Sequence, residues 1–350
     1  MTAAAPEPAA TSTAASSVAP SPLLDLQGAV AGDGVDAAVA AHYGDPMREQ
    51  RRLTDGTGFV DLSHRPVLQI TGADRMSWLH SLCTQHLEST GPGVSSTALF
   101  LSPRGRVEHA IYLVTTEDAV WLHTEPGAAD ALRQFLESMR FMLRVEITDR
   151  TDEFALVWRP GPPSGHHLTR AAVDSLGGHE VFLPRAELPA LLAGDEAGPP
   201  AGLWAYEALR IVAHVPRFGL DTDDRAIPNE MNWLGSAVHL DKGCYRGQET
   251  VARVNNLGRP PRRLVFLYLD GSVDDLPSHG SAVSLDGREV GAIGSSARHF
   301  EFGPVALALV RRTVPVDAVL VAAGASAPVT ATQEVVVPPD VGLHVRRKLS

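Results

Sequence analysis

The pattern of apolar and polar positions predicts alternating strands and helices in the first half of the chain. The segment "RPVLQI" at residues 65–70 is expected to be a strand, and apolar residues spaced three and four apart predict helices around residues 79–86 and 132–139. Between these helices, residues 97–114 predict two strands joined by a turn, and residues 119–123 predict a third. This order is typical of α+β units of ferredoxin-like character rather than a doubly wound sheet.

The pattern changes twice in the second half of the chain. Residues 161–200 are rich in glycine and proline and predict a loop. After this loop, apolar spacing predicts a helix over residues 204–212, with Arg210 on its polar side. From Arg262 onward, short β runs with an Asp-Gly hairpin signal at residues 286–287 predict a small separate β-barrel.

These patterns divide the chain into five predicted segments. An Ala- and Pro-rich tail, expected to be disordered, comes first, and two halves of a folded domain, a C-terminal β-barrel and a second tail follow. Their bounds are 1–40, 41–160, 161–260, 261–335 and 336–350.

The composition describes a globular protein with an acidic balance. Of the 350 residues, 44% are hydrophobic and 20% are charged, and no apolar run is long enough to cross a membrane. The opening segment lacks the basic start and apolar centre of a secretory signal, and two cysteines make no disulfide framework, so a cytoplasmic location is expected. A formal charge of −11 argues against a general nucleic-acid binder. The neighbouring histidines 166 and 167 lack a further ligand at useful spacing, so no metal site is predicted.

The stretch "DKGCYRGQE", residues 241–249, concentrates reactive residue types that are rare elsewhere. The chain has only two lysines and two cysteines, at Lys242, Lys348, Cys83 and Cys244. Cys83 falls in the apolar stripe of a predicted helix and is interpreted as a buried hydrophobe. Lys242 and Cys244 would share one side of an extended backbone, where the ammonium favours the thiolate form of the cysteine. The two glycines of the stretch imply a tight loop.

Five arginines surround this stretch and would suit a small ligand rich in carboxylate or phosphate groups. They are Arg246, Arg253, Arg259, Arg262 and Arg263. Pairing with carboxylates of the protein surface is the alternative for each of them. Gln248 and Glu249 either hydrogen-bond the edge of a heterocycle or close the turn. A cysteine protease would need a histidine that nothing in the sequence orients toward Cys244, and two distant cysteines cannot ligate an iron–sulfur cluster by themselves.

The stretch "KGCYRGQE" resembles the K-G-C-Y-x-G-Q-E signature of the YgfZ-type folate-binding proteins, relatives of the glycine cleavage system T-protein, an aminomethyltransferase. The segments "LRIVAHVPRFGLD", "IPNEMNW" and "VLQITGADRMSWLHSLCTQHL" are also similar to this family, so the resemblance covers roughly residues 52–313. It implies an α+β fold in which two related units, the two halves of a folate-binding domain, and a C-terminal β-barrel enclose a central channel for tetrahydrofolate.

The same resemblance implies partners and site residues. Besides folate, the partners would be iron–sulfur enzymes or their assembly proteins, which the chain would help to assemble or repair. Cys244 would be the working thiol and Lys242 its activating charge. The residues assigned to the folate pocket are Gly243, Tyr245, Gly247, Gln248, Glu249, Arg253 and Glu230.

One departure from the family weakens an enzymatic role. Where T-protein relatives carry paired aspartates, one of which assists attack on the folate, this chain has Glu108, His109 and Ala110. A shift of one residue along a strand moves a side chain to the opposite face, so Glu108 is no equivalent. The family's glycine after the predicted helix is His214 here, which would narrow the channel. Two alternatives stay open: a folate-dependent one-carbon transferase using Glu108, Glu230 or a histidine, and a scaffold that has lost folate binding.

Overall fold

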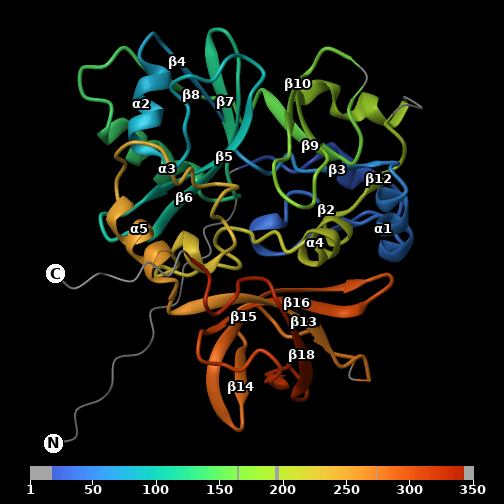
Figure 1. The fold of residues 1–350 in the computed structure, drawn as a ribbon. Helices are drawn as coiled ribbons and strands as arrows, with labels where there is room; N and C mark the ends of the chain where they lie inside the picture. Colours follow the sequence, from blue (N-terminus) through green and yellow to red (C-terminus); the bar gives the residue numbers. More distant parts are fainter. Residues whose placement is uncertain (1–17, 164, 194–196, 273, 343–350) are drawn as a thin grey trace, which may run out of the picture.

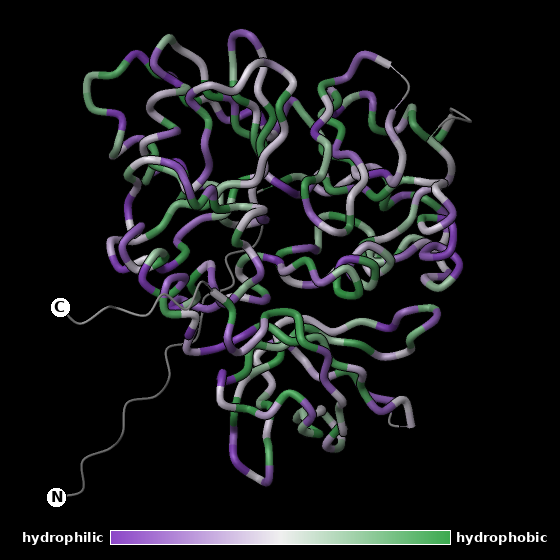
Figure 2. The backbone as a smooth tube through the Cα atoms, in the orientation of Figure 1, coloured by the Kyte–Doolittle hydropathy of each residue, from purple (hydrophilic) through white to green (hydrophobic). Residues whose placement is uncertain are grey.

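The computed structural model describes residues 18–163, 165–193, 197–272 and 274–342, and it consists of two α+β units and a β-barrel (Figure 1). The two units lie side by side above the barrel in this view, and the barrel is formed by the C-terminal part of the chain. Figure 2 shows that hydrophilic residues gather at many of the outer loops and hairpin tips. This arrangement is the predicted α+β class with a C-terminal barrel.

The first unit is a five-stranded antiparallel sheet with two helices, in the strand order β5-β6-β7-β4-β8. Its elements are β4 (Val67–Thr71), α2 (Arg75–Leu82), β5 (Ser95–Leu101), β6 (Val107–Thr115), β7 (Ala119–His123), α3 (Ala129–Ser138) and β8 (Glu146–Asp149). Leu79 and Cys83 from the end of α2, with Leu132 and Leu136 of α3, are buried against this sheet. The predicted strands, the helix predicted over residues 132–139 and the buried position of Cys83 are confirmed. The other predicted helix begins earlier and ends at Leu82, so Cys83 caps it and His86 lies beyond it.

The second unit is a mixed sheet that takes strands from both predicted halves of the chain. Its order is β10-β11-β9-β3-β12, with β3 and β12 parallel. Its strands are β3 (Phe59–Asp61), β9 (Phe154–Arg159), β10 (Leu168–Ala171), β11 (His179–Pro184) and β12 (Pro200–Ala201). The predicted boundary at residue 160 therefore falls inside this sheet. The Gly- and Pro-rich segment predicted as a loop holds two of its strands and the 3-10 helix η3 (Arg185–Ala193), because cross-strand pairing and burial of residues such as Phe182 outweigh local propensity.

The C-terminal part closes into a six-stranded barrel in the order β13-β16-β15-β14-β17-β18, as predicted. The strands are β13 (Arg262–Leu269), β14 (Ala282–Leu285), β15 (Arg288–His299), β16 (Gly303–Arg311), β17 (Leu320–Ala322) and β18 (Val329–Val335). Asp286 and Gly287 join β14 to β15 with φ values of 50° and 74°. Positive φ at both positions is the conformation that favours Asp-Gly in a two-residue hairpin.

The folded part of the chain extends at both ends into the segments that the sequence predicts to be tails. Residues 18–40, assigned to the disordered tail, contribute to four short elements: η1 (Pro22–Asp25), β1 (Val30–Ala31), η2 (Gly34–Asp36) and β2 (Ala40–His42). Leu23 and Val39 are almost completely buried and anchor this segment, which the Ala-rich composition concealed. Val337, in the second predicted tail, is also buried. Residues 1–17 and 343–350 of the two tails lie outside the described residues.

An apolar cluster forms where the two units and the barrel meet. It joins Leu99 of β5, Ala110 of β6 and Phe266 of β13 to residues of the connecting helices, and we call these side chains the central cluster. The helices not yet described are α1 (Pro46–Thr54), α4 (Leu203–Val212), η4 (Pro228–Glu230) and α5 (Gln248–Leu257). No helix among the described residues is long and apolar enough to span a membrane.

A buried network of charges centred on Arg217 ties the N-terminal segment to both units. Arg217 donates from Nε to Glu125 Oε2 at 2.7 Å, from Nη2 to Asp36 Oδ1 at 2.7 Å and from Nη1 to Glu207 Oε1 at 3.2 Å. We call these four residues the Arg217 network. Asp36 belongs to η2, Glu125 follows β7, and Glu207 lies on α4. Three segments that are distant in sequence are therefore joined at one guanidinium group.

Asp221 continues this arrangement into the barrel. Its Oδ2 atom accepts hydrogen bonds from Arg210 Nη1 and from the Arg217 backbone N–H, both at 2.8 Å, and its Oδ1 atom accepts from Ser295 Oγ of β15 at 2.7 Å. A Cβ on Gly294 would lie 2.3 Å from the same Oδ1 atom. Arg210, predicted on the polar side of α4, is therefore buried rather than solvated. These contacts tie the segment around Asp221 to α4 and to the barrel.

Candidate functional site

The stretch at residues 241–249, here called the motif loop, rests on the turn between β5 and β6. Gly247 has a φ of +82°, and a Cβ built on it would lie 2.5 Å from the Ser102 carbonyl oxygen and 2.9 Å from the Gly105 Cα. Only glycine combines this positive φ with so close a backbone approach. Gly105 in turn leaves room for Thr250 in the first turn of α5. The glycine therefore docks α5 against the hairpin that carries β6.

Lys242 points into the protein and holds the motif loop against the end of α2. Its Nζ atom donates to the carbonyl oxygens of His80, Cys83 (2.7 Å) and Gln85 (3.1 Å). The ammonium lies 5.3 Å from the centre of the Tyr245 ring, and Gln248 Nε2 donates to the Lys242 carbonyl at 3.4 Å. Carbonyl groups at a helix C-terminus lack intrahelical partners and attract cations. This placement replaces the predicted role of Lys242 as the activating charge of the Cys244 thiol.

Replacing Lys242 with methionine is expected to destabilise the fold without altering the thiol. The variant leaves several buried carbonyls without donors, which costs about 1–3 kcal/mol of unfolding free energy. Urea unfolding measures this loss. The rate at which iodoacetamide alkylates Cys244 is expected to be the same in both proteins. A clearly slower reaction in the variant would restore Lys242 as the activating group.

The motif loop exposes one thiol between two buried anchors. Cys244 is exposed, whereas Cys83 is buried and burial raises the pKa of its thiol. A side chain on Gly243 would enter open space. Tyr245 is 8% exposed and belongs to the central cluster, so its ring is an anchor of the loop rather than a surface for ligand. The loop therefore presents Cys244 to solvent while Lys242 and Tyr245 hold it in place.

Two acidic residues assigned to the folate pocket are instead paired with arginines. Glu230 is 1% exposed, and its Oε1 atom accepts from the backbone N–H and Nε of Arg262 at 3.0 and 3.1 Å. Its Oε2 atom accepts from Arg262 Nη2 at 2.9 Å, which ties η4 to the start of the barrel. Glu249 and Arg253 form an exposed pair at 2.6 Å along α5. Neither pair is among the residues that line the two hollows described below.

The arginines near the motif are also largely engaged. Arg246 pairs with Glu108 at 3.2 Å, and Arg263 is fully buried and donates to Gln333 at 2.7 Å. With Arg253 and Arg262 already paired, four of the five arginines are occupied inside the protein. The alternative interpretation, pairing with carboxylates, therefore holds for Arg246, Arg253 and Arg262, whereas Arg263 is buried and donates to an amide oxygen instead.

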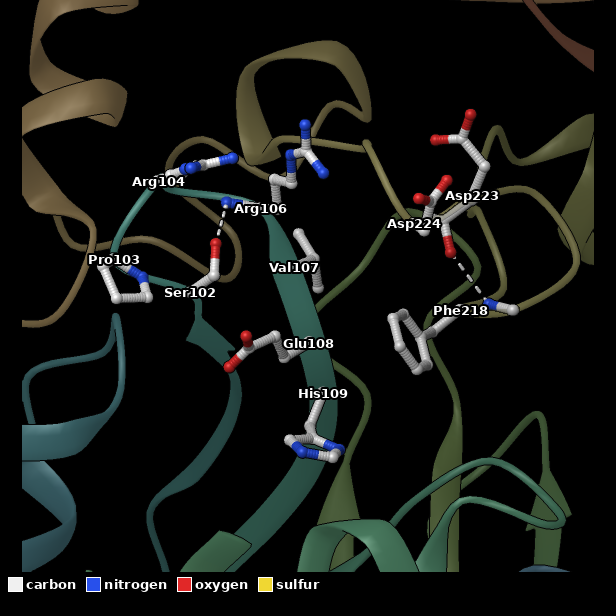
Figure 3. A pocket seen from close by; sticks show the side chains of 12 residues that line it. Ser102, Pro103, Arg104, Arg106, Val107, Glu108, His109, Phe218, Asp223 and Asp224 are labelled. Atoms are coloured by element: carbon white, nitrogen blue, oxygen red, sulfur yellow. Dashed lines mark hydrogen bonds between the residues drawn. The ribbon is translucent and has the colours of Figure 1, made fainter.

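A hollow of about 740 Å³ lies between the β5–β6 hairpin and segment 218–224, next to the motif loop (Figure 3). Arg104 and Arg106 extend from the hairpin turn, and Phe218 faces them from the opposite segment. Glu108, His109, Asp223 and Asp224 complete much of the lining. Among the described residues, the guanidinium groups of Arg104 and Arg106 have no hydrogen-bond or ion-pair partner. We call this space the motif-side hollow.

The three residues in place of the family's aspartates offer no free carboxylate to the centre of the protein. Glu108 pairs with Arg246 at the rim of the motif-side hollow. The His109 ring packs on Phe135 with 5.5 Å between ring centres, and burial lowers the pKa of its imidazole to about 4. Ala110 is 1% exposed and belongs to the central cluster. His109 is therefore neutral at physiological pH, and Glu108 faces outward.

A second hollow, of about 300 Å³, lies where the two units face each other, and we call it the central hollow. Tyr112 of β6, Asp174 of the β10–β11 turn and Trp233 line it. His214, expected to narrow the channel, is also in its lining and has a φ of +59°. The sequence analysis did not identify Tyr112, Asp174 or Trp233 as site residues.

The two hollows share their walls. β6 supplies Glu108 to one and Tyr112 to the other, and segment 214–224 lines the central hollow at its start and the motif-side hollow beyond Phe218. Four residues along a strand span about 13 Å. The two hollows are therefore offset by about this distance along one strand.

Comparisons with known proteins agree with this architecture. Residues 22–181 match the family model described as the GCVT N-terminal domain. A chloroplastic protein of Arabidopsis thaliana named a putative transferase is 26% identical over 276 residues, which cover 69% of this chain and 62% of that protein. The chain thus spans less than two thirds of that relative. An aminomethyltransferase of Herpetosiphon aurantiacus is 25% identical over 283 residues, covering 72% of this chain and 77% of that protein.

The similarity of fold extends over nearly the whole chain. The crystal structure of the glycine cleavage system aminomethyltransferase T from Bartonella henselae superposes with a TM-score of 0.77, covering 92% of this chain and 97% of that one, at 18% identity. The matched family model stops at residue 181, whereas this likeness includes the barrel. The chain is therefore similar to the GCVT N-terminal domain over residues 22–181, and it shares its overall fold with an aminomethyltransferase T.

Proposed function

We propose that this protein binds a reduced folate along β6 and supports iron–sulfur enzymes through the exposed thiol of Cys244. The folate part of this proposal rests on the two hollows, whose linings differ. A folate is a long molecule with a planar heterocycle at one end and carboxylates at the other. The aromatic central hollow suits the heterocycle, and the unpaired Arg104 and Arg106 of the motif-side hollow suit the carboxylates.

The part of the proposal that concerns iron–sulfur enzymes rests on the exposure of Cys244. The loop is braced by Lys242 and Tyr245, so the thiol is held at the surface rather than inside either hollow. A surface thiol reaches groups on another protein, whereas a thiol that acts on bound folate would have to line the cavity. The structure thus favours a working thiol separate from the ligand, which agrees with the resemblance of "KGCYRGQE" to the YgfZ-type proteins.

A one-carbon transferase is the competing function, and the relatives named aminomethyltransferase favour it. This reaction would need an acid or base beside the bound heterocycle. Glu108 is paired with Arg246, and Glu230 is enclosed by Arg262. Asp174 is the acidic residue that lines the central hollow. A transferase would therefore depend on Asp174, and the accessory function would depend on Cys244.

Calorimetric titration with 5-formyltetrahydrofolate, on the wild type and on Cys244→Ala and Cys244→Ser, tests this proposal. All three proteins are expected to bind the folate with dissociation constants within about twofold of each other, because the thiol lines neither hollow. Cells that carry only the Cys244→Ala or Cys244→Ser protein are expected to lose activity of an iron–sulfur enzyme, as cells lacking the protein do.

Two results would contradict different parts of the proposal. If the wild type binds no reduced folate, the folate half fails and the scaffold alternative gains support. If both variants sustain the iron–sulfur enzyme fully, the thiol half fails, and assays for one-carbon transfer become the next step.

A further inference from the structure

A third hollow, of about 440 Å³, lies between the N-terminal segment, α4 and the barrel. Within the described ranges it shares no lining residue with the motif-side hollow or the central hollow. It forms where α4 lies against β15 of the barrel (Figure 1). The apolar part of its wall includes Met47 of α1, Leu203 and Trp204 of α4, and Leu276 and Ala297 on the side of the barrel. We call this space the α4–barrel pocket.

The walls of this pocket are joined to each other by contacts within the protein. Gln50 of α1 donates from Nε2 to the Arg298 carbonyl of β15 at 2.9 Å, and its Oε1 atom accepts from the Phe300 N–H at 2.9 Å. At the start of α4, a Cβ on Gly202 would lie 2.2 Å from the Ala41 carbonyl oxygen, so α4 packs closely on β2. The pocket is therefore formed by the fold itself, as ligand pockets usually are.

Trp204 places a partly exposed indole ring in the lining of the pocket. It lies in the first turn of α4, where Leu203 and Ala205 on either side are buried, yet it is 52% exposed. The ring packs against His42, with 5.0 Å between ring centres. Indole is the aromatic side chain to which cations bind best, and a ring fixed in this way is ready to bind one.

Two polar groups of the lining are acceptors that the protein leaves without a donor. Among the residues that the structure describes, the Asp33 carboxylate has no hydrogen-bond or ion-pair partner. His279 contacts the Gly294 carbonyl oxygen through Nδ1 at 3.0 Å. Because a carbonyl oxygen only accepts, the neutral imidazole carries its proton on Nδ1, and Nε2 is left as an acceptor.

The charges around the pocket favour a cation. Both arginines of the lining are occupied, Arg217 by the three carboxylates of the Arg217 network and Arg298 by Asp274. The positive end of α4 also has an anion in place, since Glu49 Oε2 accepts from the Gly202 N–H at 2.8 Å. The lining therefore offers a free negative charge and an aromatic ring, and its positive groups are already paired.

We propose that the α4–barrel pocket binds a primary ammonium group on an aliphatic stem. The ammonium takes the Asp33 carboxylate and the Trp204 ring as its partners, with His279 Nε2 as a further acceptor, and the stem packs on Met47 and Leu276. A free alkylamine and a lysine side chain of another protein both carry this group, which has a pKa of about 10 and is charged at pH 7. The inference goes beyond the proposed folate binding and does not depend on it.

The test compares 1-aminopentane with 1-pentanol, which has the same stem without the charge. Binding to the full chain is followed by ligand-observed NMR titration at pH 7 and 50 mM salt. The variants are Asp33→Asn and Trp204→Leu, both at exposed positions, and the Asp33 side chain caps no helix, so both are expected to fold. Asp25→Asn is the matched control, because Asp25 is an exposed acid of the same N-terminal segment outside the pocket.

The wild type is expected to bind 1-aminopentane at least about tenfold more tightly than 1-pentanol. Asp33→Asn and Trp204→Leu are each expected to weaken binding of the amine by about 3- to 10-fold, because an exposed carboxylate and an exposed ring each make a modest contribution. Asp25→Asn is expected to change the affinity by less than about twofold.

Three results would overturn the inference: equal binding of the amine and the alcohol, no saturable binding of the amine, or a loss in Asp25→Asn as large as that in Asp33→Asn. A further probe, Nα-acetyl-lysine methylamide, carries the same ammonium on a peptide backbone and identifies the source of the group. If it binds at least as tightly as 1-aminopentane, the site takes a lysine of a partner protein. Weaker binding supports a free alkylamine as the ligand.

Discussion

Replacing Arg217 with methionine is expected to lower the unfolding free energy by about 3–5 kcal/mol at pH 7, the largest effect on stability predicted for this protein. Arg217 is 3% exposed and is shared by Asp36, Glu125 and Glu207. Methionine fills much of the space but leaves three carboxylates without their common partner. The three carboxylates then repel each other in a buried site, and unfolding relieves this repulsion.

The loss of stability in Arg217→Met is expected to depend on pH with a definite sign. In the wild type, burial would raise the pKa of Asp36, but the hydrogen bond from His64 and the charge of Arg217 outweigh it and hold the pKa below its usual value. Burial is likewise outweighed at Glu125 by Arg65 and Arg217, and at Glu207 by Arg210 and Arg217, so both pKa values are lowered. Carboxylates with lowered pKa stabilise the fold above their unfolded pKa of about 4, and this contribution is lost as the pH falls below it.

The difference in unfolding free energy between wild type and variant is therefore expected to be largest near pH 7 and to shrink as the pH falls below about 4, where the carboxyl groups begin to take up protons. Urea unfolding at pH 3, 4 and 7 measures it. Arg225→Met, at an exposed arginine, is the control and is expected to stay within about 0.5 kcal/mol of the wild type. A difference for Arg217→Met that is constant across this range would contradict the electrostatic explanation and leave lost packing as the cause.

Replacing both Arg104 and Arg106 with alanine is expected to reduce the affinity for a polyglutamylated reduced folate by about tenfold or more. Both guanidinium groups lack partners among the described residues, so ligand carboxylates would be their first ion pairs. Both lie near solvent, which limits the contribution of each pair and makes it sensitive to salt. Calorimetry at 50 and 300 mM salt, with mono- and polyglutamylated folates, measures the effect.

Arg253→Ala provides the matched control for the double variant, because Arg253 was the arginine assigned to the ligand from the sequence. It pairs with Glu249 on the exposed face of α5, so its removal is expected to change the affinity by less than about twofold. If Arg253→Ala weakens binding while the double variant does not, the ligand tail lies along α5 and the motif-side hollow has been assigned wrongly.

Much of the fold could be predicted from local patterns in the sequence. The strands around Val120 and Leu156 and the hairpin at residues 286–287 follow from apolar runs and turn chemistry between neighbours in sequence. Two strands in the Gly- and Pro-rich segment 161–200 were missed because the pairing of β10 with β11, and of β11 with β9, is a tertiary effect. The ordered N-terminal segment was missed for the same reason, since Asp36 is fixed by Arg217, 181 positions away.

The candidate site was recognisable as a stretch of sequence but not as a set of contacts. The rarity of lysine drew attention to Lys242, yet its partners are backbone carbonyls about 160 positions earlier, which side-chain patterns do not reveal. Asp174 lies in a turn with no motif and becomes notable only because it lines the same hollow as Tyr112 and Trp233. The "PRGR" turn did contain a signal, since two arginines in a hairpin tip have few local partners.

The burial of Lys242 has a consequence for the chemistry of the protein surface. Lys348, the other lysine of the chain, lies outside the described residues, so the described part offers no exposed side-chain amine. Its positive surface charge comes from arginines, which keep their charge at any physiological pH and do not accept acyl groups or ubiquitin as lysines do. Acetylation, ubiquitin conjugation and amine-reactive cross-linkers would therefore find no side-chain target in the folded body unless the motif loop opens and releases Lys242.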